Sequence, residues 1–111
     1  DITGKIIGCA MEVHNRLGAG FQEFVYQKAL AIEMKLQGLT YVEEQEMIIF
    51  YRETAIAKRR VDFWVENKIS VEIKARTELT DEHFAQAMNY LEVLKIEIVL
   101  LLTINFSFAV A

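Results

Sequence analysis

The chain has 111 residues and a formal net charge of −4, from 12 Lys and Arg against 16 Asp and Glu. Its 53% hydrophobic content predicts one folded domain over residues 1–111, and its single cysteine excludes an intramolecular disulfide framework or a CxxC metal cluster. No apolar run reaches the ~18 residues of a membrane span, and charged residues appear too early for a signal peptide. We therefore expect a cytoplasmic protein with no membrane segment.

Two helices are predicted at the beginning of the chain. Apolar residues recur at helical spacing until Gly18 and Gly20 interrupt the pattern, which indicates a first helix at Thr3–Leu17. A second helical pattern covers Gln22–Gln37 and ends at Gly38, a residue type that commonly terminates helices.

Strands dominate the rest of the chain, with one further helix among them. A helix between the third and last strands permits these two strands to run parallel. The last strand is apolar throughout, which predicts a central position with both faces buried. The expected elements are strands at Tyr41–Tyr51, Arg60–Val65 and Ile69–Ala75, a helix from Thr80 to Leu94, and a strand at Ile96–Ile104.

The second and third strands alternate between an apolar and a polar set of side chains. A shared apolar face requires Val65 to pair with Ile69, and this register places Asp62 opposite Glu72. A slip of one residue would bury the wrong set. The apolar set is Val61, Phe63, Val65, Ile69, Val71 and Ile73, and the polar set is Asp62, Trp64, Ser70, Glu72 and Lys74.

Two carboxylates that face each other across a hairpin repel unless a cation lies near them. Lys74 follows on the same face and supplies one cation, whereas clustered carboxylates are also the usual protein ligands of Mg²⁺. From spacing alone, a solvated outer face with an ordinary ion pair is the simpler interpretation. Trp64 on this face shifts the balance toward a binding site, because solvent-exposed faces seldom carry tryptophan.

Three more polar residues have two interpretations each. Glu23 begins the second helix, either because acids stabilise helix N-termini or because it points inward toward a metal. Gln86 and Tyr90 are four residues apart and share a helix face, either as a polar pair beside the core or as part of a site.

Together these residues form motifs in a specific order. The motifs are Gly20-x-x-Glu23-x-x-Tyr26, then Asp62 followed after nine residues by Glu72-Ile73-Lys74, then Gln86-Ala-Met-Asn-Tyr90. In this order they resemble the GxxExxY protein family of bacteria and archaea, which is placed in the PD-(D/E)XK nuclease superfamily. The similarity covers essentially the whole chain. One departure is Ala19, where the family usually has proline.

The resemblance implies a restriction-endonuclease-like α/β fold with an αβββαβ core, in which helices flank a mixed sheet. It also implies a role for each motif residue. Asp62, Glu72, the Ile73 carbonyl and Glu23 would hold Mg²⁺ or Mn²⁺. Lys74 would position or activate the attacking water and stabilise charge on the phosphate, Gln86 and Tyr90 would orient Lys74 or a phosphate, and Tyr26 would support the site. Arg59, Arg60 and Arg76 either contact the nucleic-acid backbone or lie at a solvated strand end.

The function implied is metal-dependent hydrolysis of DNA phosphodiester bonds, with DNA as partner and no membrane. The acidic net charge argues against non-specific coating of nucleic acid. The acidic charge and the small size favour the alternative of a non-cleaving nucleic-acid- or protein-binding module that retains the fold. They are equally consistent with a nuclease that needs a second copy or a protein partner. An unrelated α/β interaction protein with the acids on its surface is the third hypothesis.

Overall fold

The computed structural model describes residues 1–74, 81–93, 98–103 and 108–110. The elements agree with the expected αβββαβ core, which a further helix precedes and a short strand follows. They are α1 (Ile2–Leu17), α2 (Glu23–Leu36), β1 (Tyr41–Tyr51), β2 (Thr54–Val65), β3 (Ile69–Lys74), α3 (Asp81–Val93), β4 (Ile98–Thr103) and β5 (Phe108–Val110). Ala75, Arg76, Thr80, Leu94, Ile96 and Ile104, which the sequence analysis named, lie outside the described residues.

The strands form one five-stranded sheet in the order β1-β2-β3-β4-β5. β3 and β4 run parallel, whereas the other neighbouring strands are antiparallel. This confirms the mixed sheet and the parallel crossover. β4 lies between two strands, and Leu100, Leu101 and Leu102 are all buried, as predicted for a central strand.

Two strand predictions were incomplete. β2 begins at Thr54 rather than at Arg60, and β5 was not predicted. Residues 54–58 are all exposed, so their side chains carry no alternation of buried and exposed positions from which a strand could be read. β5 has three residues, which is too short for a periodic pattern.

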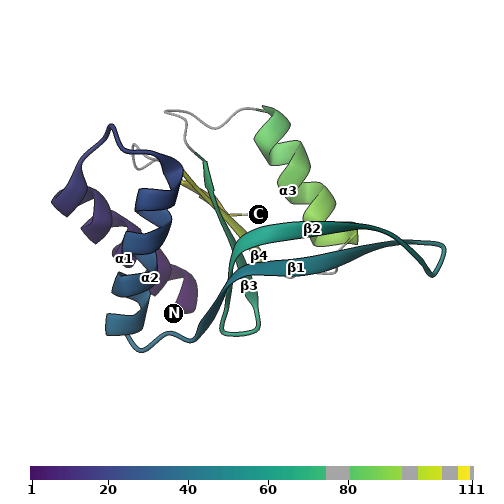
Figure 1. Ribbon diagram of the computed structural model, residues 1–111, viewed down its shortest axis with the longest axis horizontal. Coiled ribbons are helices and arrows are strands. Elements are labelled where there is room, and N and C mark those ends of the chain that lie inside the picture. Colours follow the sequence, from purple (N-terminus) through teal and green to yellow (C-terminus); the bar gives the residue numbers. More distant parts are fainter. Residues whose placement is uncertain (75–80, 94–97, 104–107, 111) are drawn as a thin grey trace.

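Helices lie on both sides of the sheet (Figure 1). α1 and α2 pack together on one side of β3 and β4, and α3 lies on the other side. The core forms mainly between the first two helices and the apolar face of β2 and β3. Its members include Ile6, Val13, Leu30 and Met34 from the helices and Phe63, Val65, Ile69, Val71 and Ile73 from the strands. Among the described residues, no helix is both long and apolar enough to cross a bilayer.

The β2–β3 hairpin has the predicted register. Val65 pairs with Ile69, and Phe63 pairs with Val71. Glu66, Asn67 and Lys68 form the turn, and the first two have positive φ angles of 52° and 54°. The Glu66 carboxylate accepts hydrogen bonds from the backbone N–H and the hydroxyl of Thr40, which tie this turn to the segment before β1.

β1 and β2 continue beyond the sheet as a two-stranded arm. Figure 1 shows this hairpin extending away from α1 and α2. Its turn consists of Arg52 and Glu53, which have φ angles of 47° and 69°, and Tyr51 pairs with Thr54 directly beside it. Two successive positive φ angles are typical of the type I′ turn, which matches the twist of the strands that it connects.

Candidate active site

The polar face of β2 and β3 is buried rather than solvated. Glu72 is 3% exposed and Ser70 is 0% exposed, while Asp62 and Lys74 are half-buried. α3 lies on this side of the sheet (Figure 1) and contributes a side chain that contacts Lys74. The structure therefore contradicts the interpretation of an outer hairpin face with an ordinary surface ion pair. Burying carboxylates costs free energy unless they are paired or bind a cation.

Asp62 is held against the backbone of the neighbouring strand. Its Oδ2 accepts a hydrogen bond of 2.6 Å from the N–H of Ile73. The antiparallel pairs run from Val65–Ile69 to Phe63–Val71 and end one residue before Asp62 and Glu72. Asp62 thus continues the hairpin with its side chain rather than with a further backbone pair, and this contact fixes its carboxylate beside the next strand.

Burial raises the pKa of Asp62 above its ordinary value, and the charge of Glu44 adds to this effect. The hydrogen bond from Ile73 and the positive charges of Lys74 and Arg59 oppose the rise without cancelling it. The carboxylate is therefore a stronger base than an exposed aspartate.

Glu72 shows the larger perturbation. Burial, followed by the charge of Asp62, raises its pKa to about 7, against the opposing charges of Lys74 and Arg59. Its Oε1 is buried and has no hydrogen-bond partner among the described residues. A carboxylate in this condition is stabilised either by a proton or by a bound cation.

Lys74 contacts the third helix. Its Nζ donates a hydrogen bond of 3.2 Å to Oε1 of Gln86 on α3. The positive charge of Lys74 also lowers the pKa of both carboxyl groups, which places it within electrostatic reach of Asp62 and Glu72. The side chain of Tyr90 lies outside the described residues.

The Gly20-x-x-Glu23-x-x-Tyr26 motif shapes the connection between α1 and α2. The hydroxyl of Tyr26 donates to the carbonyl of Gly18 at 2.6 Å and accepts from the N–H of Phe21 at 3.3 Å. Gly20 has a φ of 108°, which disfavours residues with a side chain. Tyr26 is buried in the core, so its contribution is to hold the loop that precedes Glu23.

Glu23 is the first residue of α2 and is half-buried. Its negative charge helps to raise the pKa of Glu72, so it acts on the same site. Among the described residues, however, no three Asp, Glu, His or Cys side chains come together as a group that could hold a metal ion. Direct coordination of a metal by Glu23 therefore stays a prediction.

The oxygen atoms of Asp62, Glu72 and the Ile73 carbonyl are ligands of the kind that a small, hard cation prefers. Mg²⁺ is usually bound by one or two carboxylates and keeps several of its waters, so a larger carboxylate cluster is not required. The unpartnered Oε1 of Glu72 beside the charged Asp62 is what such a cation would neutralise. Asp62, Glu72 and the carbonyl of Ile73 are the groups that could hold it.

Glu44 is a neighbour of the site that the sequence analysis missed. It lies on β1 between the pairs Glu43–Phe63 and Gln45–Val61, and therefore beside Asp62, whose pKa it helps to raise. Its φ of 53° departs from strand geometry. The register of β1 against β2 would have been enough to find Glu44, because the pairs on either side of it place it opposite Asp62.

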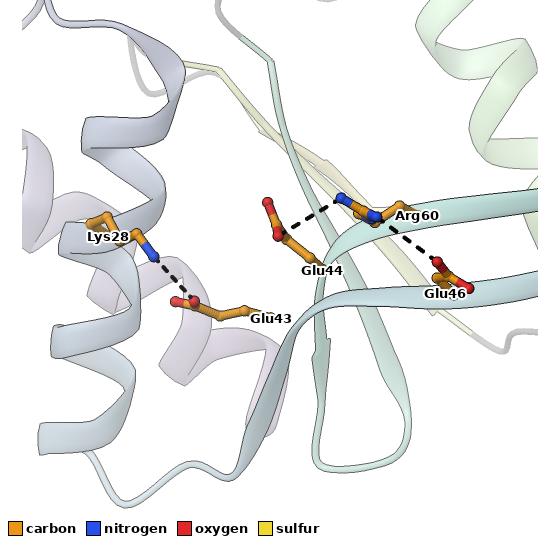
Figure 2. A network of polar contacts seen from close by, with 5 residues as sticks. All are labelled: Lys28, Glu43, Glu44, Glu46 and Arg60. Atoms are coloured by element: carbon orange, nitrogen blue, oxygen red, sulfur yellow. Dashed lines mark hydrogen bonds and ion pairs between the residues drawn. The ribbon is translucent and has the colours of Figure 1, made fainter.

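Two of the three proposed nucleic-acid contacts can be located, while Arg76 lies outside the described residues. Arg60 forms ion pairs with Glu44 at 3.9 Å and Glu46 at 3.8 Å (Figure 2). Arg59 is half-buried, and its charge lowers the pKa of both site carboxyl groups. Arg59 is thus the one of these two arginines whose positive charge acts on the carboxyl groups of Asp62 and Glu72.

Comparison with known proteins supports the interpretation of this geometry. A family model described as the PD-(D/E)XK nuclease superfamily matches residues 1–111. No curated protein and no solved structure gives a significant match. The match spans the carboxylates, the lysine and the helices that position them. The chain therefore belongs to the PD-(D/E)XK nuclease superfamily.

Proposed function

We propose that this protein is a divalent-metal-dependent nuclease that hydrolyses DNA phosphodiester bonds. The observation that carries the proposal is the Glu72 carboxylate, buried beside Asp62 with one oxygen unpartnered, in a chain that belongs to a nuclease superfamily. With the buried Cys9 as its only cysteine, the protein is suited to a reducing cytoplasm, where we place it.

In this proposal Asp62, Glu72 and the Ile73 carbonyl bind Mg²⁺ or Mn²⁺, and Glu23 adds negative charge from α2. A bound divalent ion lowers the pKa of its water and polarises the phosphodiester. The N–H of Ile73 keeps the Asp62 carboxylate oriented through the 2.6 Å hydrogen bond. Burial of Glu72 excludes bulk water from one side of the site and strengthens its electrostatic interactions.

Lys74 supplies positive charge where negative charge develops on the phosphate during hydrolysis. Gln86 accepts a hydrogen bond from its Nζ and so fixes the direction of the ammonium group. Preorganised charge of this kind needs no rearrangement when the reaction occurs, which is why the lysine is held by a second residue.

A non-cleaving binding module is the second candidate. The net charge of −4 and the ion pairs that hold Arg60 favour the protein-binding form of this module, because both reduce attraction to a phosphate backbone. This module would retain the fold and the carboxylates and would bind nucleic acid or protein without hydrolysis.

A cleavage assay separates these functions. Purified protein is incubated with single-stranded, duplex and branched DNA in Mn²⁺ or in chelator. We expect metal-dependent cleavage of at least one substrate, and a loss of at least about a hundredfold in Lys74→Ala. Lys68→Ala is the matched control, because Lys68 is an exposed lysine in the turn of the same hairpin.

Equal cleavage by Lys74→Ala and the natural protein would indicate a contaminating nuclease or another site. Metal-independent DNA binding without any cleavage would favour the binding module. Circular dichroism of both variants shows whether the fold is retained.

A further inference from the structure

β1 has a long edge without the usual protection. It is the first strand of the sheet order, so one of its edges has no strand neighbour among the described residues. Natural edge strands are kept from pairing by charges, prolines, bulges or short length. Residues 47–51, Met-Ile-Ile-Phe-Tyr, contain neither a charge nor a proline.

The pairing of β1 with β2 contains one β-bulge, which lies on β2 and leaves β1 continuous. Ile49 pairs with Ala57 and Phe50 pairs with Ala55, so the additional residue is Ile56 on β2. β1 itself departs from strand geometry at Glu44, whose φ is 53°. The regular edge therefore lies in the outer half of β1, where the arm extends from the body (Figure 1).

This part of the arm exposes large apolar side chains. Ile48, Phe50, Tyr51 and Ile56 are between 47% and 62% exposed. A cluster of exposed large apolar residues on a monomer commonly marks an interaction surface.

The outer half of β1, together with Arg52 of the turn that follows it, is complementary to itself. Residues 46–52 read Glu-Met-Ile-Ile-Phe-Tyr-Arg, with an acid at one end, a base at the other and apolar residues between. When two such segments pair antiparallel about Ile49, Glu46 of each copy lies opposite Arg52 of the other. Apolar residues then face apolar residues at every position between these two charge pairs.

We propose that two copies of this chain associate by antiparallel pairing of residues 46–51 of β1, with Arg52 at the start of each adjoining turn beside Glu46 of the other copy, which joins their two five-stranded sheets. The partner is a second copy because the segment is complementary in charge to itself across a two-fold axis, which is the symmetry of a closed dimer interface. DNA fits this surface less well, because residues 47–51 carry no positive charge that could attract a phosphate backbone. The inference does not depend on the proposed nuclease activity.

The test measures the mass of the protein by sedimentation over a range of concentrations. The natural protein is expected to form a dimer. Arg52→Asp and Glu46→Lys each place like charges opposite one another twice, and each should weaken the dimer about tenfold or more. Aspartate tolerates the left-handed conformation of the turn, so Arg52→Asp keeps the hairpin.

Mixing the two variants gives the decisive result. A heterodimer of Arg52→Asp with Glu46→Lys has opposite charges at both ends, so the mixture should recover dimers that neither variant forms alone. Glu53→Lys is the matched control, because Glu53 lies in the same turn but faces the neutral Gln45 in this register. It should dimerise as the natural protein does.

A monomeric natural protein would overturn the proposal, as would a dimer that is insensitive to both charge reversals or a mixture that stays monomeric. Weaker DNA binding by the arm variants of a monomeric protein would instead assign the arm to nucleic acid. Because the readout is mass, failure here leaves the cleavage assay unaffected.

Discussion

The two faces of the β2–β3 hairpin differ in how completely they are buried and in what they bury, since Asp62 and Lys74 on the polar face stay half-buried. Ser70 and Val71 are adjacent and both completely buried, one on each face. The face toward α1 and α2 is apolar and packs as a core. The face toward α3 buries Glu72 with an unpartnered oxygen and raises its pKa. Burial on the first face stabilises the fold, whereas burial of a carboxylate on the second costs stability unless a proton or a cation neutralises it.

The largest expected effect is on the apolar face. Phe63 is fully buried and packs edge-to-face against Tyr41, with ring centroids 5.7 Å apart. Phe63→Ala should lower the free energy of unfolding by about 3–5 kcal/mol, because it removes buried apolar surface and leaves a cavity. Urea denaturation measures this loss. A loss below about 1 kcal/mol would contradict the assignment of this face as the main core.

The second effect is a pH dependence that only the polar face produces. Because the folded state raises the pKa of Glu72 from 4.5 to about 7, folding retains a proton that the unfolded chain releases at lower pH. This stabilisation is present below pH 4.5 and is lost as the pH rises through about 7. Stability should fall by up to about 3 kcal/mol over this window.

Denaturant titrations at pH 5 and pH 8 measure this fall. Glu72→Gln cannot titrate and should flatten the dependence, leaving the smaller contribution of Asp62, whose pKa is shifted in the same direction. An unchanged pH profile in Glu72→Gln would show that another group titrates.

The third effect concerns metal binding at the polar face. Mn²⁺ should raise the melting temperature of the natural protein, since a ligand at a hundredfold excess over Kd stabilises the folded state by about 2.7 kcal/mol. Asp62→Asn should lose most of this response. In chelator, the same variant should be as stable as the natural protein or more stable, because it removes a charge that raises the pKa of Glu72.

Thermal melts of both proteins with Mn²⁺ and with chelator check this prediction. An Asp62→Asn variant that is clearly less stable in chelator, together with a natural protein indifferent to Mn²⁺, would make the carboxylates structural. The nuclease proposal would then be withdrawn.

The smallest effect compares the two adjacent residues directly. Val71→Ala should cost about 2 kcal/mol, because a packed side chain is truncated. Ser70→Ala should change stability by less than about 0.5 kcal/mol or increase it, because the buried hydroxyl has no hydrogen-bond partner among the described residues. Equal losses in the two variants, measured by urea denaturation, would show that the faces contribute alike.

The sequence by itself determined the order of the core elements and the register of the β2–β3 hairpin. The alternation of apolar and polar residues permits one pairing that buries a single apolar face, and Val65 pairs with Ile69 as this requires. The same pattern placed Asp62, Glu72 and Lys74 on one face. The parallel pairing of β3 with β4 followed from the intervening helix.

Only the tertiary structure decided that this polar face is buried, because the covering helix, α3, comes later in the chain and its position depends on packing. The role of Tyr26 likewise depends on a contact with Gly18, eight residues earlier in the chain. The first part of β2, residues 54–58, was not predicted because its side chains are all exposed and show no alternation of buried and exposed positions. Periodicity records which side of an element faces the core, whereas the element that covers the other side is set by long-range packing.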